Sequence, residues 1–200
     1  LRAVTASATN DHRLGGHEAP PAIISIFLGD ELTNILENIA LGKNNPINSA
    51  GALNLGIEGV PTLNADAGDR NRTSPFAFTG NKFEFRMPGS SSTPATTAAA
   101  INAAVSKVLG EYADKLEASN DVDKTVLEII TQAYKNHSRI IFNGNGYSEE
   151  WAKEAEKRWL TNLTSSNEAL RSLISPEMIA MFKETGMVTK EEAEARYSAY

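Results

Sequence analysis

The sequence predicts an α+β protein in which strands and long loops are followed by a mainly helical C-terminal part. Residues 1–110 hold seven of the eight prolines and eleven of the fourteen glycines, and both residue types mark turns and loops. Residues 111–200 place apolar side chains at helical spacing and carry five of the six net negative charges. We therefore expect two parts, a part with strands and shaped loops over 1–110 and a helical region over 111–200.

The composition excludes several classes of protein. Of the 200 residues, 41% are hydrophobic and 22% are charged, which is typical of a folded globular chain. A formal net charge of -6 argues against a nucleic-acid-binding face. No apolar run approaches the roughly 20 residues that a membrane-spanning helix needs. Cysteine is absent, which excludes disulfides and thiolate metal sites. We expect a cytoplasmic protein that binds neither nucleic acid nor membrane.

Three short strands are predicted in the first part. They cover residues 23–28, 76–79 and 82–87, where apolar residues are concentrated or alternate with polar ones. Between them, the run from about residue 42 to residue 72 shows little periodicity. A loop of that length in a compact domain is usually functional or disordered.

Helices are predicted over most of the remaining chain. Residues 92–94 read Ser-Thr-Pro, a hydroxyl cap followed by proline, and predict the start of a helix over 92–117. Apolar residues at helical spacing predict a second amphipathic helix over 126–141. Shorter helices are expected over 166–174, 176–184 and 189–200.

A further helix is predicted over residues 148–160. Its spacing puts Trp151, Ala155 and Trp159 on one face and pairs opposite charges four residues apart on the other. The Asn-Gly-Asn-Gly run at 143–146 predicts a turn, because it completes no nucleotide-binding pattern. The helical region is therefore expected to serve packing and to hold no catalytic residue.

Polar residues that could support chemistry are concentrated in three clusters. The first cluster, residues 10–21, combines charged side chains with paired glycines and paired prolines, so its backbone has a defined shape. The second cluster, residues 69–75, contains Arg70 and Arg72. Arginines in a loop are often plain surface charges, and that alternative stays open.

The third cluster lies on the strand predicted over 82–87. Alternation puts Lys82, Glu84 and Arg86 on one face and phenylalanines on the other. A cation–carboxylate–cation row is costly if it is buried without partners. It suits a face that meets a metal-bound phosphate, with the carboxylate on the cation and guanidinium on the phosphoryl oxygens. A solvated sheet face is the alternative.

Together the three clusters resemble the C-terminal catalytic region of glutamine synthetase, and specifically its type III class. Residues 10–21, with Asn-Asp-His-Arg-Leu-Gly and then Glu-Ala-Pro-Pro, are similar to the family's glutamate-binding and flap segment. Residues 70–72, Arg-Asn-Arg, resemble its phosphate-contacting loop, and residues 82–86 resemble its Arg-x-Glu-x-Arg strand. The long insertion at 22–69 favours type III. The resemblance implies part of that family's catalytic sheet, followed by a helical layer.

The resemblance implies roles in phosphoryl transfer from ATP. Arg72 and Arg86 would be catalytic residues that neutralise the transferring phosphoryl group, and with Lys82 they would bind the nucleotide phosphates. Glu84 would ligate a Mg²⁺ or Mn²⁺ ion that bridges these phosphates. Catalysis of this step is mostly electrostatic, which explains the residue types.

The resemblance also implies sites for glutamate and ammonia. Arg13 would bind a carboxylate of the substrate glutamate. Glu18 would be both catalytic and substrate-binding: it would lie on a flap that shields γ-glutamyl phosphate from water, and it would help to deprotonate bound ammonium. Shielding matters because water competes for the same intermediate.

The whole protein implied by the resemblance is an ATP-dependent glutamate–ammonia ligase that forms a homo-oligomer, a dodecamer. The chain begins without Met and ends in a helical composition, so we expect a piece of a longer protein that is inactive alone. Two other functions stay open. One is a γ-glutamyl ligase for an amine other than ammonia, and the other is a non-catalytic assembly or regulatory module.

Overall fold

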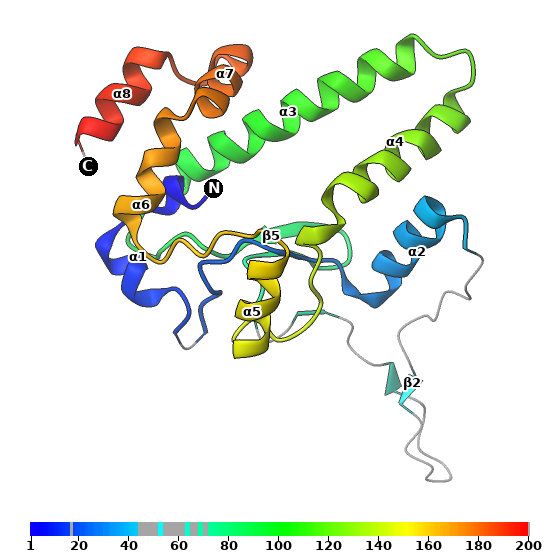
Figure 1. Ribbon diagram of the computed structural model, residues 1–200, viewed down its shortest axis with the longest axis horizontal. Helices are drawn as coiled ribbons and strands as arrows, with labels where there is room; N and C mark the ends of the chain where they lie inside the picture. Colours follow the sequence, from blue (N-terminus) through cyan, green and yellow to red (C-terminus); the bar gives the residue numbers. More distant parts are fainter. Residues whose placement is uncertain (17, 44–51, 54–62, 65–67, 70–71, 200) are drawn as a thin grey trace.

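The computed structural model describes residues 1–16, 18–43, 52–53, 63–64, 68–69 and 72–199. Most of the described chain is helical, and a small mixed sheet lies near its centre (Figure 1). This agrees with the predicted α+β class. The predicted boundary near residue 110 falls within a helix, α3, and the division into two parts stays a prediction.

The central sheet has three strands in the order β1-β4-β5, which are Ile26–Phe27, Phe76–Phe78 and Phe83–Phe85. β1 runs parallel to β4, and β4 runs antiparallel to β5. Ile26 also forms an isolated parallel bridge with Ile141. The three predicted strands are confirmed, although each observed strand is shorter. A separate antiparallel pair joins β2, Ala52–Leu53, to β3, Leu63–Asn64.

The two faces of the β4–β5 hairpin differ in chemistry. Phe76 pairs with Phe85 and Phe78 pairs with Phe83, so four aromatic rings share one face. The Phe76 and Phe83 rings stack with centroids 5.4 Å apart. Glu84 pairs with an alanine on the opposite face. The predicted alternation of charged and aromatic side chains along this strand is therefore confirmed.

Eight α-helices are found in the part of the chain that the structure describes. They are α1 (Ala8–Arg13), α2 (Gly29–Leu41), α3 (Ala95–Glu117), α4 (Val122–His137), α5 (Glu149–Lys157), α6 (Ser166–Leu170), α7 (Pro176–Thr185) and α8 (Lys190–Ala199). Short 3-10 helices cover Ala3–Thr5, Ser138–Ile140 and Arg171–Ile174.

Hydrogen-bonding caps explain where several helices begin. The side chain of Asp121 accepts from the backbone N–H of Lys124 at the start of α4. The side chain of Ser148 accepts from the backbone N–H of Trp151 at the start of α5. Ser175 caps α7, which has proline at its first position. The helix predicted from residue 92 begins at Ala95, because Thr93 lies outside it and its hydroxyl accepts from the Ala95 N–H.

Two predictions about the helices were wrong. α2 was missed, because it begins with Gly29 and Asp30, which are typical of a turn, although Leu32, Ile35 and Leu36 have helical spacing. Trp159 does not share the buried face of Trp151, because α5 ends at Lys157. The Trp159 backbone is left-handed, with φ 58, and its side chain is 86% exposed, whereas Trp151 is buried.

Two hydrophobic clusters hold the described elements together. One joins the N-terminal 3-10 helix to α7 and α8 through Ala3, Phe182 and Ala193. The other lies under the sheet, where Trp151 stacks on Phe142 with ring centroids 3.8 Å apart. This second cluster holds α5 against the segment that bridges to β1.

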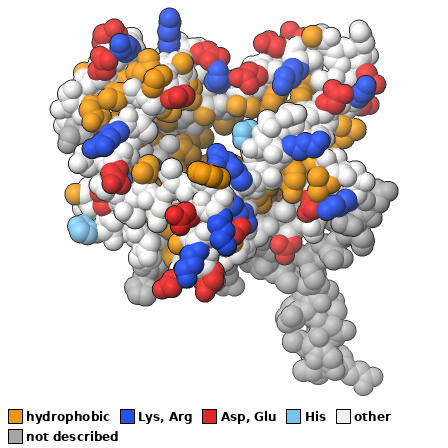
Figure 2. Space-filling model, in the orientation of Figure 1, with side chains coloured by type: hydrophobic (Ala, Val, Ile, Leu, Met, Phe, Trp, Pro, Cys, Tyr) orange, Lys and Arg blue, Asp and Glu red, His pale blue; other side chains and the backbone are white. Residues whose placement is uncertain are grey.

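The helical hairpin of α3 and α4 extends away from the sheet, and α2 packs beside α4 (Figure 1). On the face shown in Figure 2, acidic and basic side chains are interspersed, with hydrophobic side chains between them. Among the described helices, none combines the length and the apolar character needed to cross a lipid bilayer.

Candidate functional site

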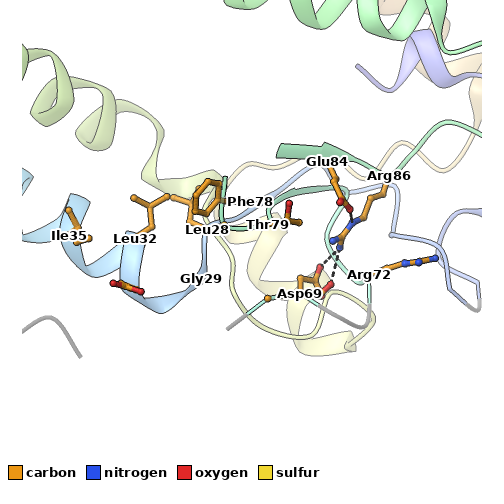
Figure 3. A pocket seen from close by; sticks show the side chains of 13 residues that line it. Leu28, Gly29, Leu32, Ile35, Asp69, Arg72, Phe78, Thr79, Glu84 and Arg86 are labelled. Atoms are coloured by element: carbon orange, nitrogen blue, oxygen red, sulfur yellow. Dashed lines mark hydrogen bonds and ion pairs between the residues drawn. The ribbon is translucent and has the colours of Figure 1, made fainter. Parts of the chain in front are cut away.

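A pocket of about 710 Å³ opens between the N-terminal end of α2, residues 68, 69 and 72, and the β4–β5 hairpin (Figure 3). The wall formed by α2 is mainly apolar but includes Glu31, and the other wall carries the charged side chains of Asp69, Glu84 and Arg86. The lining residues are Leu28, Gly29, Glu31, Leu32, Ile35, Gly68, Asp69, Arg72, Phe78, Thr79, Gly80, Glu84 and Arg86. Three of the predicted site residues, Arg72, Glu84 and Arg86, therefore line one cavity.

Arg86 is fixed at the charged wall by contacts on two sides. Its Nη1 lies 2.9 Å from Oδ2 of Asp69 and 3.1 Å from the Asp69 carbonyl oxygen. Its Nε lies 3.4 Å from Oε2 of Glu84 on the same strand. The side chains of Arg86 and Asp69 are only 13% and 6% exposed, so this is a largely buried ion pair.

Asp69 is itself held by the turn that it begins. Its Oδ2 accepts from the Ser74 N–H at 2.8 Å, and its Oδ1 accepts from the Thr73 N–H at 3.3 Å. Its carbonyl oxygen accepts from the Arg72 N–H at 3.2 Å. An aspartate that bonds the backbone a few residues ahead is a common way to fix a turn. Sequence reasoning quoted Asp69 within the second cluster but gave it no role.

Arg72 follows Asp69 in this turn with a left-handed backbone, φ 56. Its side chain is exposed and extends away from the Asp69 carboxylate (Figure 3). It forms no side-chain hydrogen bond or ion pair with another residue that the structure describes. Arg70, Asn71 and His17, which belong to the predicted clusters, lie outside the described residues.

Glu84 presents an ionised carboxylate to the pocket. Lys82 Nζ lies 3.3 Å from its Oε1. A hydrogen bond from Lys82, together with the charges of Lys82 and Arg86, lowers the pKa of Glu84 in spite of opposing desolvation. The Glu84 side chain is 41% exposed, so a ligand can reach it. Lys82 lies on the same strand face but does not line the cavity.

Arg13 lies outside the pocket, at the last position of α1. Its Nη2 is 3.2, 2.6 and 3.0 Å from the carbonyl oxygens of Arg86, Met87 and Pro88, and its Nε is 3.0 Å from Oδ1 of Asn10. The guanidinium therefore binds the chain where it leaves β5. These contacts tie the predicted glutamate-binding segment to the strand that carries Glu84 and Arg86.

Glu18 is exposed in the connection between α1 and β1, where its backbone is left-handed with φ 59. A hydrogen bond of 2.9 Å from the Gly15 N–H to the Pro20 carbonyl closes this loop. Burial raises the pKa of Tyr147, and the negative charges of Asp69 and Glu18 raise it further. Tyr147 therefore lies within electrostatic reach of both carboxylates.

A second cavity, of about 470 Å³, adjoins the first and shares Gly68 and Asp69 with it. It is lined by Phe27, Gly68, Asp69, Thr73, Asn143, Gly144, Asn145 and Tyr147. Residues 143–145 thus belong to the walls of the candidate site, although the helical region was expected to serve packing alone. The signal was the repeated Asn-Gly, which was interpreted only as a turn.

Asn143 connects this second cavity to the pocket. Its Oδ1 accepts from the backbone N–H groups of Leu28 and Gly29, at 3.1 Å each. Its Nδ2 donates to Thr33 Oγ1 at 2.9 Å. One side chain thereby holds the N-terminal end of α2, which forms the apolar wall. Sequence reasoning missed this role.

The described residues offer part of a metal site. No group of three or more His, Cys, Asp or Glu side chains lies close enough to hold an ion among the residues that the structure describes. Three carboxylates line the pocket, but that of Asp69 is held by Arg86 and the Ser74 N–H, and that of Glu31 belongs to α2. On the charged wall, Glu84 presents an ionised, exposed carboxylate to the pocket. It fits one ligand of a hard divalent cation.

Comparison with known proteins gives consistent matches. A family model described as the glutamine synthetase C-terminal domain matches residues 125–200. The chain is 42% identical to the type-3 glutamine synthetase of Dictyostelium discoideum, over 98% of this chain and 27% of that protein. It is 44% identical to the glutamine synthetases of Butyrivibrio fibrisolvens and Bacteroides fragilis, over 98% and 97% of this chain. The chain spans 28% of the length of each of these two relatives.

Proposed function

Because the chain belongs to the glutamine synthetase family, we propose that it forms one part of the active site of an ATP-dependent glutamate–ammonia ligase. The observation that carries the proposal is the charged wall of the pocket. There Arg86, Glu84 and Arg72 line one cavity, with Arg86 held by a buried carboxylate and Glu84 ionised and exposed. Such a wall suits a phosphate that is bound with a divalent cation.

In the first step, an oxygen of the glutamate γ-carboxylate attacks the γ-phosphorus of ATP, and ADP leaves. γ-Glutamyl phosphate is the product. Negative charge on the transferring phosphoryl oxygens is stabilised by fixed positive groups, and this is the main contribution that a protein makes to phosphoryl transfer. Arg86 and Arg72 supply these charges, and Lys82 adds a more distant one beside Glu84.

The divalent cation, Mg²⁺ or Mn²⁺, would be held in part by Glu84. When bound, it neutralises charge on the nucleotide phosphates. Further ligands must come from elsewhere in the protein, because no group of three or more candidate ligand side chains is found among the described residues and the chain spans 27% to 28% of its relatives. For the same reason we propose that residues 1–200 are inactive alone. From the family resemblance we also propose that the whole protein acts as a homo-oligomer, a dodecamer.

In the second step, ammonia attacks the acyl carbon of γ-glutamyl phosphate, inorganic phosphate leaves and a proton is lost. Glu18 is proposed to accept a proton from ammonium and to shield the acyl phosphate from water. Arg13 is proposed to bind a glutamate carboxylate. Its Nη2 already donates to backbone carbonyl oxygens. The glutamate carboxylate would therefore bind Nη1, which has no hydrogen-bond partner within the described residues.

The experiment uses the full-length protein with glutamate, ATP and hydroxylamine, and it measures γ-glutamyl hydroxamate. We expect Glu84→Ala and Arg86→Ala to lower kcat by about 100- to 1,000-fold, as the loss of a transition-state contact does. Glu128→Ala and Arg171→Ala remove matched exposed charges outside the pocket and should retain full activity. An intact, folded wild-type protein without activity would instead favour the assembly-module function.

A second comparison tests the amine substrate. Glu18→Ala should reduce glutamine formation from ammonia much more than hydroxamate formation from hydroxylamine, because hydroxylamine is the bulkier nucleophile and needs no deprotonation of an ammonium ion. Equal losses with the two nucleophiles would contradict the role of Glu18. If the wild-type protein used a larger amine well and ammonia poorly, the result would favour a γ-glutamyl ligase for an amine other than ammonia.

A further inference from the structure

We infer that Asp69 is a positioning residue that sets the place of Arg86 in the phosphate site, and this inference rests on the proposed function. Arg86 has two fixed nitrogens. Nη1 donates to both Oδ2 and the carbonyl oxygen of Asp69, and Nε lies beside Glu84. Nη2 forms no hydrogen bond within the part of the chain that the structure describes. We assign this third nitrogen of the rigid fork to the bound phosphoryl group.

The rigidity of this arrangement comes from the turn. Asp69 Oδ2 is shared between Arg86 and the Ser74 N–H, at 2.9 and 2.8 Å. The 6% exposed Asp69 side chain has little room to move. An arginine that is already ordered loses less freedom when it binds a phosphoryl group, and its charge stays at one place during the reaction.

The same residue also orders the second arginine of the wall. The Asp69 carbonyl oxygen accepts from the Arg72 N–H at 3.2 Å as well as from Arg86. One residue therefore fixes the side chain of Arg86 and the backbone of Arg72, which come from separate elements. A surface ion pair would order neither of them, because it is screened and mobile.

A role in folding alone would also explain a buried ion pair, and a double-mutant cycle separates the two roles. If Asp69 acts through Arg86, then removing its charge should matter only while Arg86 is present. If it only stabilises the protein, its removal should reduce activity by the same factor in either background. Arg86→Gln is the suitable partner variant, because it removes the guanidinium that Asp69 holds and keeps a polar side chain at this position.

The cycle is measured in the full-length protein as kcat for γ-glutamyl hydroxamate. Asp69→Asn keeps one acceptor oxygen for the turn, replaces the other with an NH2 group and loses the charge. We expect a fall in kcat of about 10- to 100-fold with little change in the KM for glutamate. In the Arg86→Gln background the same change should cost no more than about twofold. Ser74→Ala is the matched control, because the Ser74 hydroxyl has no partner within the described residues and only its N–H contacts Asp69.

Each other outcome is informative. Asp69→Asn with unchanged kcat, beside an inactive Arg86→Gln, overturns this inference and leaves the proposed function intact. Equal losses in the two backgrounds also overturn it. A fully active Arg86→Gln contradicts the proposed function itself. If Asp69→Asn does not fold, Asp69→Glu replaces it in the cycle, because the longer side chain keeps the charge and displaces Arg86. Full kcat in that variant would overturn the inference.

Discussion

Replacing Asn143 by alanine should make local opening of the N-terminal end of α2 more frequent and leave local opening elsewhere in the fold unchanged. The change removes the acceptor of two backbone N–H groups, those of Leu28 and Gly29, and the donor to Thr33. Gly29 is buried and Leu28 is half-buried, so water cannot fully replace the lost partner. The apolar wall of the pocket is built on this end of the helix.

The magnitude follows from the burial of the two N–H groups. A buried donor without a partner costs about 1 to 3 kcal/mol. Taking the Gly29 N–H at about 2 kcal/mol and the less buried Leu28 N–H at about 1 kcal/mol gives about 3 kcal/mol for local opening. Since 1.4 kcal/mol is a factor of ten, amide hydrogen exchange at these two positions should become roughly 100-fold faster.

The assay is hydrogen exchange of the full-length protein, read in peptides that cover α2 and, for comparison, α3 and α8. Asn145→Ala is the matched control, because the Asn145 side chain accepts only from the Tyr147 N–H in its own turn. Unchanged exchange at Leu28 and Gly29 in Asn143→Ala would refute the reasoning. Equal acceleration in α3 and α8 would do so too, since it would indicate a global effect.

Two further predictions concern glycines and pH. At Gly146 an added Cβ would lie 2.3 Å from the Thr73 carbonyl oxygen, so Gly146→Ala should lower the free energy of unfolding by about 1 to 3 kcal/mol and displace the turn that carries Arg72. At Gly110, inside α3, an added Cβ has no neighbour within 4 Å, so Gly110→Ala should raise the free energy of unfolding by about 0.5 to 1 kcal/mol. Thermal unfolding of both variants checks that the two changes have opposite signs. Burial raises the pKa of Asp11, but hydrogen bonds from Ser166 and the charge of the Arg2 guanidinium outweigh this effect. The pKa of Asp11 is therefore lowered from its usual 3.8. This carboxylate therefore stabilises the fold above about pH 3.8, and the contribution is lost as the pH falls through the lower folded-state pKa. Asp11→Asn should make the unfolding temperature less sensitive to pH in that acidic range, and an unchanged pH profile would contradict the prediction.

Local sequence signals predicted most of the elements correctly. Alternation at residues 82–86 was sufficient to separate the charged face of β5 from its aromatic face, because the strand period is fixed by backbone geometry. The hydroxyl residues and proline at 92–94 predicted the start of α3, which begins at Ala95. In contrast, α2 begins with Gly29 and Asp30, which are typical of a turn, and α5 ends at Lys157, so Trp159 leaves the helical face.

The contacts that shape the site could not be predicted in this way. Asp69 and Arg86 are 17 residues apart, and Asn143 lies 115 residues beyond Leu28. No period or motif in one sequence specifies which distant side chain will accept from a given backbone N–H. The polar clusters indicated Arg72, Glu84 and Arg86, while the residues that hold them in place came only from the tertiary structure.

The parallel pairing at Ile26 has a consequence for the order of folding. This one position pairs with Phe76 and bridges to Ile141, so three remote segments must meet before the sheet is complete. Closing loops of about 50 and about 115 residues costs entropy that only the finished contacts repay, and such long-range contacts slow folding. The α3–α4 hairpin is local and needs no such closure. In a refolding experiment helix content should therefore return early, and the cavity between β4, β5 and α2 should form among the last features of the chain.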